Sequence, residues 1–246
     1  MSATAPDWHH HHHHEIRGAL PLDPRPCAAI TTYEGTRMST IHLDRPFNLR
    51  YAVHARTGNY TPELLQTHRT AKRSFLYINR LHGVDDFGPV PDWSVRNDLV
   101  ASGRCAPQRA TTNPTLDGVR LWEQADAHAR AFRPEEPACA HAVCSLPQGE
   151  DVKGWRNLIE GFAEDYLTSQ GMVVDWAIHH RAESEVLPAI APHAHLLITT
   201  RVYDPVRPDC GKIRQTWIRT ERARKTLAEK WWARAGIIPR AYAMAA

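Results

Sequence analysis

Two strand-like segments joined by a short connection constrain the fold of this chain most strongly. Residues 172–180 (MVVDWAIHH) and 194–203 (AHLLITTRVY) are rich in β-branched and aromatic side chains, which fit a pleated, half-buried surface. A parallel pair needs a crossover that contains a helix, and the connection between these segments is too short for a helix with its two loops. We therefore predict that the two strands pair antiparallel.

The remaining segments complete an α+β pattern. Two further runs resemble strands, and four longer segments have the apolar periodicity and capping residues of helices. The predicted strands are residues 49–56 and 140–146, and the predicted helices are residues 61–83, 117–132, 151–171 and 218–236. Residues 84–116 contain several Pro, Gly and Asp and are predicted to form a loop. The sequence thus predicts an α+β fold with helices packed on a central antiparallel sheet.

The first 37 residues differ in composition from the rest. They contain six consecutive histidines, residues 9–14, and then a proline-rich stretch, whereas regular patterning begins just after Met38. We predict that residues 1–37 are a disordered segment, either an added tag or a natural low-complexity tract, and that residues 38–246 form one domain. The consecutive histidines are not expected to take part in a metal site.

Cysteine usage and hydropathy indicate the compartment. The five cysteines are scattered without a C-x-x-C pair, which favours free thiols in a reducing environment. No stretch approaches the roughly 20 apolar residues of a membrane span, and the N-terminal residues lack the pattern of a secretory signal. We expect a cytoplasmic protein without membrane insertion.

Positive charge is concentrated near the C-terminal end. The formal net charge is +3, whereas the residues from Arg201 onward contain 11 Lys and Arg against 4 Asp and Glu. Such a tail favours a polyanionic partner such as nucleic acid, although a solvated helix surface is the alternative. The residues expected to contact DNA phosphates are Arg201, Lys212, Arg219, Arg222, Arg224 and Lys225. Trp231 and Trp232 could stack on bases, but core packing is the commoner role of tryptophans on an apolar helix face.

Histidines on the two central strands form a candidate metal site. His193 and His195 are two residues apart, so both rings project from one face of their strand, while Leu196 points to the other face. His179 would meet them if the two strands are neighbours. Neutral imidazole is a good ligand for divalent first-row metals, and three protein ligands leave coordination positions open, as in catalytic sites.

Two residues near His179 are also candidates. Asp175 shares its face of the strand, so we predict that its carboxylate orients a ligating imidazole. His180 points to the opposite face and is the reserve ligand.

Several motifs resemble those of one known family. The run "MVVDWAIHH…PHAHLLITTR" resembles the HUH-type relaxases of the MobA/MobL family, whose strand ending "VD-x-AIH" precedes "HAH-ϕ-ϕ-x-T-x-R", where ϕ is apolar. The segments "LWEQADAHAR", "CSLP" and "RKTLAEKWWARA" also resemble family motifs, and the resemblance extends from about residue 48 to residue 236. Near Ala140 and His141 the chain lacks the Arg-Glu dipeptide that the family often carries.

This resemblance implies a metal-dependent enzyme acting on single-stranded DNA. It implies that His179, His193 and His195 hold a divalent ion, Mn²⁺ or Mg²⁺ first and Zn²⁺, Co²⁺ or Ni²⁺ as alternatives. It also implies that Tyr77 is the nucleophile, which nicks and rejoins one strand at a plasmid transfer origin through a 5′-phosphotyrosine. Accessory mobilisation proteins are implied as further partners.

The residues around Tyr77 agree with this role. Arg69, Arg73 and Arg80 share a stripe with Tyr77 on the predicted helix, and such cations would attract a DNA backbone and favour the phenolate. The alternative is a half-buried boundary tyrosine. Two other tyrosines are the fallback nucleophiles, Tyr60 and Tyr51.

Other functions remain open at this stage. A rolling-circle replication initiator would share the chemistry and differ in its DNA target, whereas an inactive relaxase remnant would bind DNA without cutting it. A metal-dependent hydrolase of small molecules is less favoured, because the sequence offers no carboxylate-rich ligand set.

Overall fold

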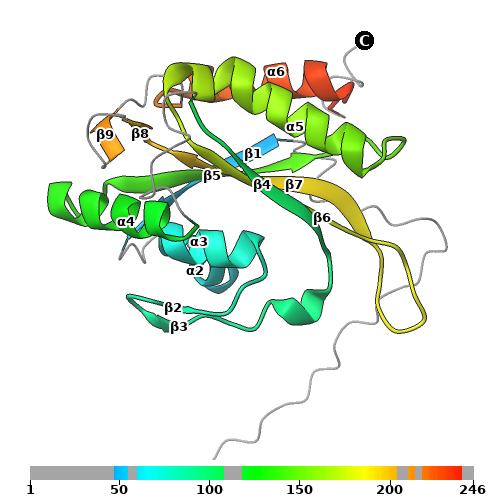
Figure 1. The fold of residues 1–246 in the computed structure, drawn as a ribbon, viewed down its shortest axis with the longest axis horizontal. Coiled ribbons are helices and arrows are strands. Elements are labelled where there is room, and N and C mark those ends of the chain that lie inside the picture. The colour runs from blue at the N-terminus through cyan, green and yellow to red at the C-terminus, as the bar shows by residue number, and fades with distance from the viewer. Residues whose placement is uncertain (1–46, 55–59, 108–117, 204–209, 214–217, 240–246) are drawn as a thin grey trace, which may run out of the picture. The chain divides into compact units, whose positions relative to one another are not determined.

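The computed structural model describes residues 47–54, 60–107, 118–203, 210–213 and 218–239, with the backbone alone at residues 203 and 210–213. The predicted disordered segment, residues 1–37, lies outside the described residues. Within them, a five-stranded sheet is accompanied by two small β-ribbons and by helices on both of its faces (Figure 1).

The sheet is antiparallel throughout, which confirms the predicted α+β class. Its strands are arranged in the order β1-β5-β7-β6-β4. They are β1 (Phe47–Val53), β5 (Pro137–Ser145), β7 (Ile190–Thr199), β6 (Val174–Arg181) and β4 (Leu99–Cys105). The ribbons pair β2 (Val84–Asp85) with β3 (Gly88–Pro89), and β8 (Arg201–Tyr203) with β9 (Cys210–Ile213).

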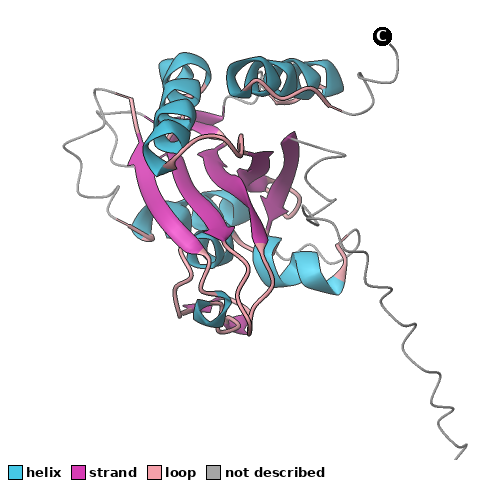
Figure 2. Ribbon diagram, turned by 90° about the vertical axis from the view of Figure 1, so that its right-hand side faces the viewer, coloured by secondary structure: helices cyan, strands magenta, loops and turns pink. Residues whose placement is uncertain are grey.

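Helices cover the sheet on both sides (Figure 2). One face carries α5 (Val152–Tyr166), which continues into a short 3-10 turn, η4 (Thr168–Gln170), and α6 (Glu221–Ala235). The other face carries α2 (Pro62–His68), α3 (Ala71–Ile78) and α4 (Arg120–Phe132), while a 3-10 turn, η1 (Ser94–Arg96), precedes β4. Among the described helices, none has the length and apolarity that crossing a membrane requires.

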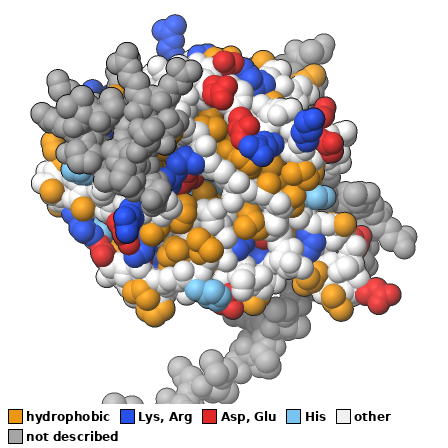
Figure 3. Space-filling view, in the orientation of Figure 1, with side chains coloured by type: hydrophobic (Ala, Val, Ile, Leu, Met, Phe, Trp, Pro, Cys, Tyr) orange, Lys and Arg blue, Asp and Glu red, His pale blue; other side chains and the backbone are white. Residues whose placement is uncertain are grey.

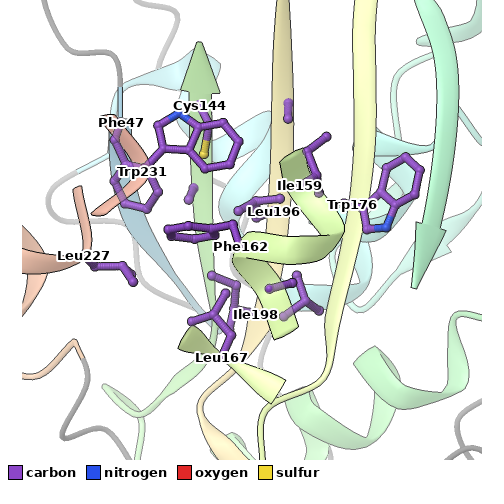
Figure 4. Close-up of a cluster of buried hydrophobic side chains, with 14 of the residues drawn as sticks. Phe47, Cys144, Ile159, Phe162, Leu167, Trp176, Leu196, Ile198, Leu227 and Trp231 are labelled. Atoms are coloured by element: carbon purple, nitrogen blue, oxygen red, sulfur yellow. The ribbon is translucent and has the colours of Figure 1, made fainter. Parts of the chain in front are cut away.

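The larger apolar core lies between the sheet and the α5–α6 layer (Figure 4). Leu196 of β7 is buried there, as the alternation along the strand predicted. Trp231 of α6 is fully buried, packs edge-on against Phe162 and donates its indole N–H to the carbonyl of Ser145. Core packing, and not base stacking, is therefore the role of Trp231.

The single helix predicted for residues 61–83 is wrong, because the chain forms two helices there. Thr70 adopts an extended backbone, and its hydroxyl caps α3 by accepting the N–H of Arg73. The carboxylate of Asp126, from α4, also accepts the N–H groups of Ala71 and Lys72 at 2.8 and 3.0 Å. These partners satisfy the donors at the start of α3, so a new helix begins where the sequence pattern indicated continuity.

The predicted loop at residues 84–116 is also partly wrong, because it contains the edge strand β4. This strand has one neighbour, β6, and its first residues are largely exposed. Its sequence, LVASGRC, therefore needs little of the apolar character that marks central strands. Gly103 lies against the ring of Trp176 on β6, where a side chain would have no room.

Gly103→Ala should lower the free energy of unfolding by about 1–3 kcal/mol. Its Cβ would lie 2.6 Å from Cζ2 of Trp176, and this ring is buried and unable to move aside. Gly149→Ala is the matched control, because a Cβ there meets no atom within 4 Å. Urea denaturation of both variants measures the difference, and equal stabilities would contradict the close packing.

Candidate functional site

The register between β6 and β7 brings three histidines together. His179 lies opposite His193, and Ala177 lies opposite His195, so the three rings project from the face that α3 covers. One nitrogen of each ring lies within 4.8 Å of the others, and all three residues are buried. The structure thus assembles the predicted triad, in a geometry that could hold one metal ion.

Each ring is oriented by a further contact. His179 donates from Nε2 to the carbonyl of Ile78, and His193 donates from Nδ1 to the carbonyl of Ala191, both at 2.8 Å. Nδ1 of His195 lies 2.8 Å from Nε2 of His141. Groups of this kind fix the ring orientation and the tautomer of metal-binding histidines.

The donor atoms fit a divalent ion. Nε2 of His195 is buried without a hydrogen-bond partner among the described residues, which is unfavourable unless a ligand uses its lone pair. Nδ1 of His179 accepts a hydrogen bond from Nη2 of Arg80 at 2.9 Å, so an ion at this nitrogen would replace that contact. All three ligands are imidazoles, a set that suits first-row transition metals.

Burial keeps the imidazoles of His179 and His195 neutral. Burial, followed by the charge of Arg80, lowers the pKa of His179 to about 4. Burial and the neighbouring histidines hold the pKa of His195 well below its ordinary value. Neutral rings retain the lone pair that coordination requires.

Asp175 is placed differently from the prediction. Its carboxylate accepts hydrogen bonds from Arg104 and, at 2.6 Å, from the indole N–H of Trp122. These partners hold β4 and α4 on β6, so the structure gives Asp175 a packing role and supplies other groups to orient the triad. Sequence reasoning missed these groups, because two are main-chain carbonyls and the third, His141, comes from β5.

Tyr77 lies beside the triad, near the end of α3. Its ring is perpendicular to those of His195 and His179, with centroids 5.4 and 6.3 Å apart. Trp93 packs edge-on against it at 5.3 Å. The structure therefore places the predicted nucleophile next to the predicted ligands.

The three arginines predicted to flank Tyr77 form no open stripe. Arg73 and Arg80 are buried in bidentate ion pairs with Asp85 and Asp98, respectively. Arg69 lies beyond the end of α2 and stacks on the ring of Phe87 at 3.6 Å. Arg80 also lies beyond α3, with a left-handed backbone (φ +54°), because the helix ends at Ile78.

Neither fallback tyrosine has its hydroxyl beside the histidine triad. The side chain of Tyr51 packs on the α5–α6 side of the sheet, where its hydroxyl donates to the carbonyl of Ile218. The hydroxyl of Tyr60 donates to the carbonyl of Tyr51. The reserve ligand His180 packs edge-on against Trp155 of α5, on the side away from the triad, as predicted.

The basic C-terminal residues lie apart from the triad. Helix α6 packs on the opposite face of the sheet, where Arg219, Arg222 and Lys225 are exposed and Arg224 donates to the carbonyl of Ile218. Arg201 is half-buried, and the side chain of Lys212 lies outside the described residues. On the face shown in Figure 3, basic and acidic side chains alternate and form no patch of one sign.

Comparisons with known proteins identify relatives. The model of the MobA/MobL family matches residues 70–236. A probable mobilization protein MobA from Bifidobacterium longum (strain NCC 2705) is 24% identical over 148 residues, which are 59% of this chain and 24% of that protein. The chain thus spans about a quarter of the length of this curated relative.

A solved structure has a similar fold. It comes from work on the molecular basis of vancomycin resistance transfer in Staphylococcus aureus, and it superposes with a TM-score of 0.54 at 20% sequence identity. The match covers 77% of this chain and 89% of that one. At this level of identity the likeness concerns the fold.

His68 should make stability depend on pH. It stacks on His141, and its pKa is lowered to about 4 by burial and then by the charge of Arg50. In the unfolded chain the imidazole of His68 takes up a proton near pH 6.5, so the free energy of unfolding should fall as the pH drops from there towards 4. Between pH 7 and about pH 4.5, the wild type should lose roughly 2–3 kcal/mol more than His68→Gln. Urea denaturation at both pH values measures this, and parallel losses would contradict it.

His141→Ala should weaken metal binding by about 10- to 100-fold, because it removes the group that orients His195. Calorimetric titration with Mn²⁺ measures the affinity. His180→Ala is the control, since this histidine adjoins a ligand in sequence but packs against Trp155 on the other side of the sheet. Unchanged affinity in His141→Ala would show that the His141 contact does not support the site.

Proposed function

This chain belongs to the MobA/MobL family, and we propose that it is a relaxase that nicks and rejoins single-stranded DNA at a plasmid transfer origin. The observation that carries the proposal is the position of Tyr77, whose ring packs against two of three converging histidines. A phenol beside a set of imidazole ligands suits the transfer of a phosphodiester to a tyrosine. The relative named as a probable mobilization protein supports the same biological role.

The histidines provide the electrostatic part of the site. A divalent ion held by His179, His193 and His195 would act as a Lewis acid on a non-bridging oxygen of the scissile phosphate. We expect Mn²⁺ or Mg²⁺, with Zn²⁺, Co²⁺ or Ni²⁺ as alternatives. The protein's own contribution is to hold the rings of His179 and His193 in fixed orientations through the carbonyls of Ile78 and Ala191.

Tyr77 provides the nucleophile. Its Oη forms a bond to phosphorus while the bond from phosphorus to the 3′ oxygen breaks, which leaves a 5′-phosphotyrosine and a 3′-hydroxyl. Since one phosphodiester replaces another, attack by a 3′-hydroxyl reseals the strand and no nucleotide cofactor is needed. Packing against Trp93 and His195 fixes the ring and limits the directions from which the phosphate can approach.

Basic residues outside the triad are proposed to bind the DNA backbone. Arg219, just before α6, and Arg222 and Lys225 on α6 are exposed and can approach phosphates. Their contribution should weaken with rising salt, because phosphate neutralisation releases counterions. Accessory mobilisation proteins are further proposed partners.

The central test is a covalent adduct with labelled single-stranded origin DNA in the presence of Mn²⁺. The unaltered protein should form an adduct that resists boiling, and chelation of the metal should prevent it. Tyr77→Phe should abolish the adduct, because the attacking oxygen is lost. Tyr51→Phe is the control and should retain it, since that hydroxyl packs on the other side of the sheet.

Other outcomes separate the rival functions. An adduct that survives in Tyr77→Phe would assign the nucleophile elsewhere. DNA binding without any adduct would identify a non-catalytic relaxase remnant. Cleavage at a replication origin in place of a transfer origin would identify a replication initiator.

A further inference from the structure

A second guanidinium group approaches Tyr77 from the segment before β4. Nη1 of Arg96, at the end of η1, lies 3.5 Å from the hydroxyl of Tyr77, and its Cζ lies 5.6 Å from the ring centroid. The residue is exposed. The sequence placed Arg96 in a loop, and no motif drew attention to it.

The backbone of Arg96 is held in place although its side chain reaches solvent. Asp92 accepts hydrogen bonds from the N–H and hydroxyl of Ser94, and Asn97 adopts a left-handed conformation (φ +46°) that ends the turn. The carbonyl of Arg96 accepts a hydrogen bond from Arg181 at the end of β6. The next residue but one, Asp98, is fixed by its ion pair with Arg80.

Arg80 and Arg96 both contact Tyr77, but among the described residues only the charge of Arg80 is matched by a carboxylate of the protein. Arg80 is buried, its charge is matched by the bidentate carboxylate of Asp98, and it donates to the carbonyl of Tyr77. Among the described contacts, the guanidinium of Arg96 pairs with no carboxylate. Arg96 therefore supplies positive charge at the phenol oxygen that the protein does not itself neutralise.

We propose that Arg96 is a further catalytic residue, whose guanidinium binds both the attacking oxygen of Tyr77 and a non-bridging oxygen of the scissile phosphate. The inference rests on the proposed function. A guanidinium has five N–H donors in a planar fork, so one can meet the phenol oxygen while another meets the phosphate. This arrangement would bring the two reacting groups together.

The charge of Arg96 suits the reaction. Tyr77 loses its proton to solvent as Oη bonds to phosphorus, and the departing 3′ oxygen keeps the electron pair of the broken bond and takes a proton from solvent. Negative charge grows on the phosphate oxygens in between. A preorganised cation at that point stabilises the transition state more than the bound substrate.

The test compares Arg96→Ala, Arg96→Lys and the control Arg156→Ala, which removes an exposed arginine on α5 that pairs with Glu160. Single-turnover adduct formation and DNA affinity are measured for each. Arg96→Ala should slow adduct formation about 100-fold, while its affinity for DNA stays within about threefold, because one phosphate contact among several is lost. Arg96→Lys should recover part of the rate, and Arg156→Ala should match the wild type.

A substrate with a neutral methylphosphonate at the scissile position tests the phosphate contact directly. The penalty of Arg96→Ala should shrink to a few-fold on this DNA, because the charge that Arg96 binds is already absent. An equal penalty on both substrates would overturn the contact and leave a packing effect. If Arg96→Ala forms the adduct at the wild-type rate, the inference about Arg96 is overturned, while the proposed function still stands on the Tyr77 adduct. If the unaltered protein forms no adduct, both are overturned.

Discussion

The antiparallel register between β6 and β7 is the constraint on which the candidate site depends. It sets His179 opposite His193, with His195 two residues further along the same face. A slip of one residue would turn the side chains of one strand to the other face of the sheet. The apolar residues on the opposite face of β7 oppose such a slip, because Leu196 and Ile198 pack beneath α5 and α6, where imidazoles would be buried without partners. The apolar core on one side of the sheet thus fixes the positions of the histidines on the other side.

The parts that were predictable from the sequence depend on local rules. Side chains alternate along a strand, and a short connection makes neighbours of two strands, so the convergence of His179, His193 and His195 could be predicted without a structure. The choice of Tyr77 followed from the family resemblance; the structure places its ring beside His195, and its role as the nucleophile stays a prediction. The central strands and most helices were predictable for the same reason, since their patterns are long and periodic.

The parts that were missed depend on contacts between segments far apart in sequence. The break before α3 is set partly by Asp126, 55 residues away from Ala71. Asp175 appeared suited to orient a histidine, but Arg104 and Trp122 bind it from β4 and α4. The contact of His141 with His195 could not be predicted either, because only the pairing of β5 with β7 brings the two rings together. No local sequence pattern predicts such long-range contacts.

The sheet separates the Tyr77–histidine cluster from the basic residues of α6. The phenol of Tyr77 and the three imidazoles lie on the side of the sheet that α2, α3 and α4 cover, whereas the exposed basic residues of α6 lie on the other side. A nucleotide strand in contact with both would have to bend around a rim of the sheet, so its protected positions would fall into two separate tracts with an accessible stretch between them. For the proposed DNA substrate, this architecture would favour a bipartite footprint over one continuous groove.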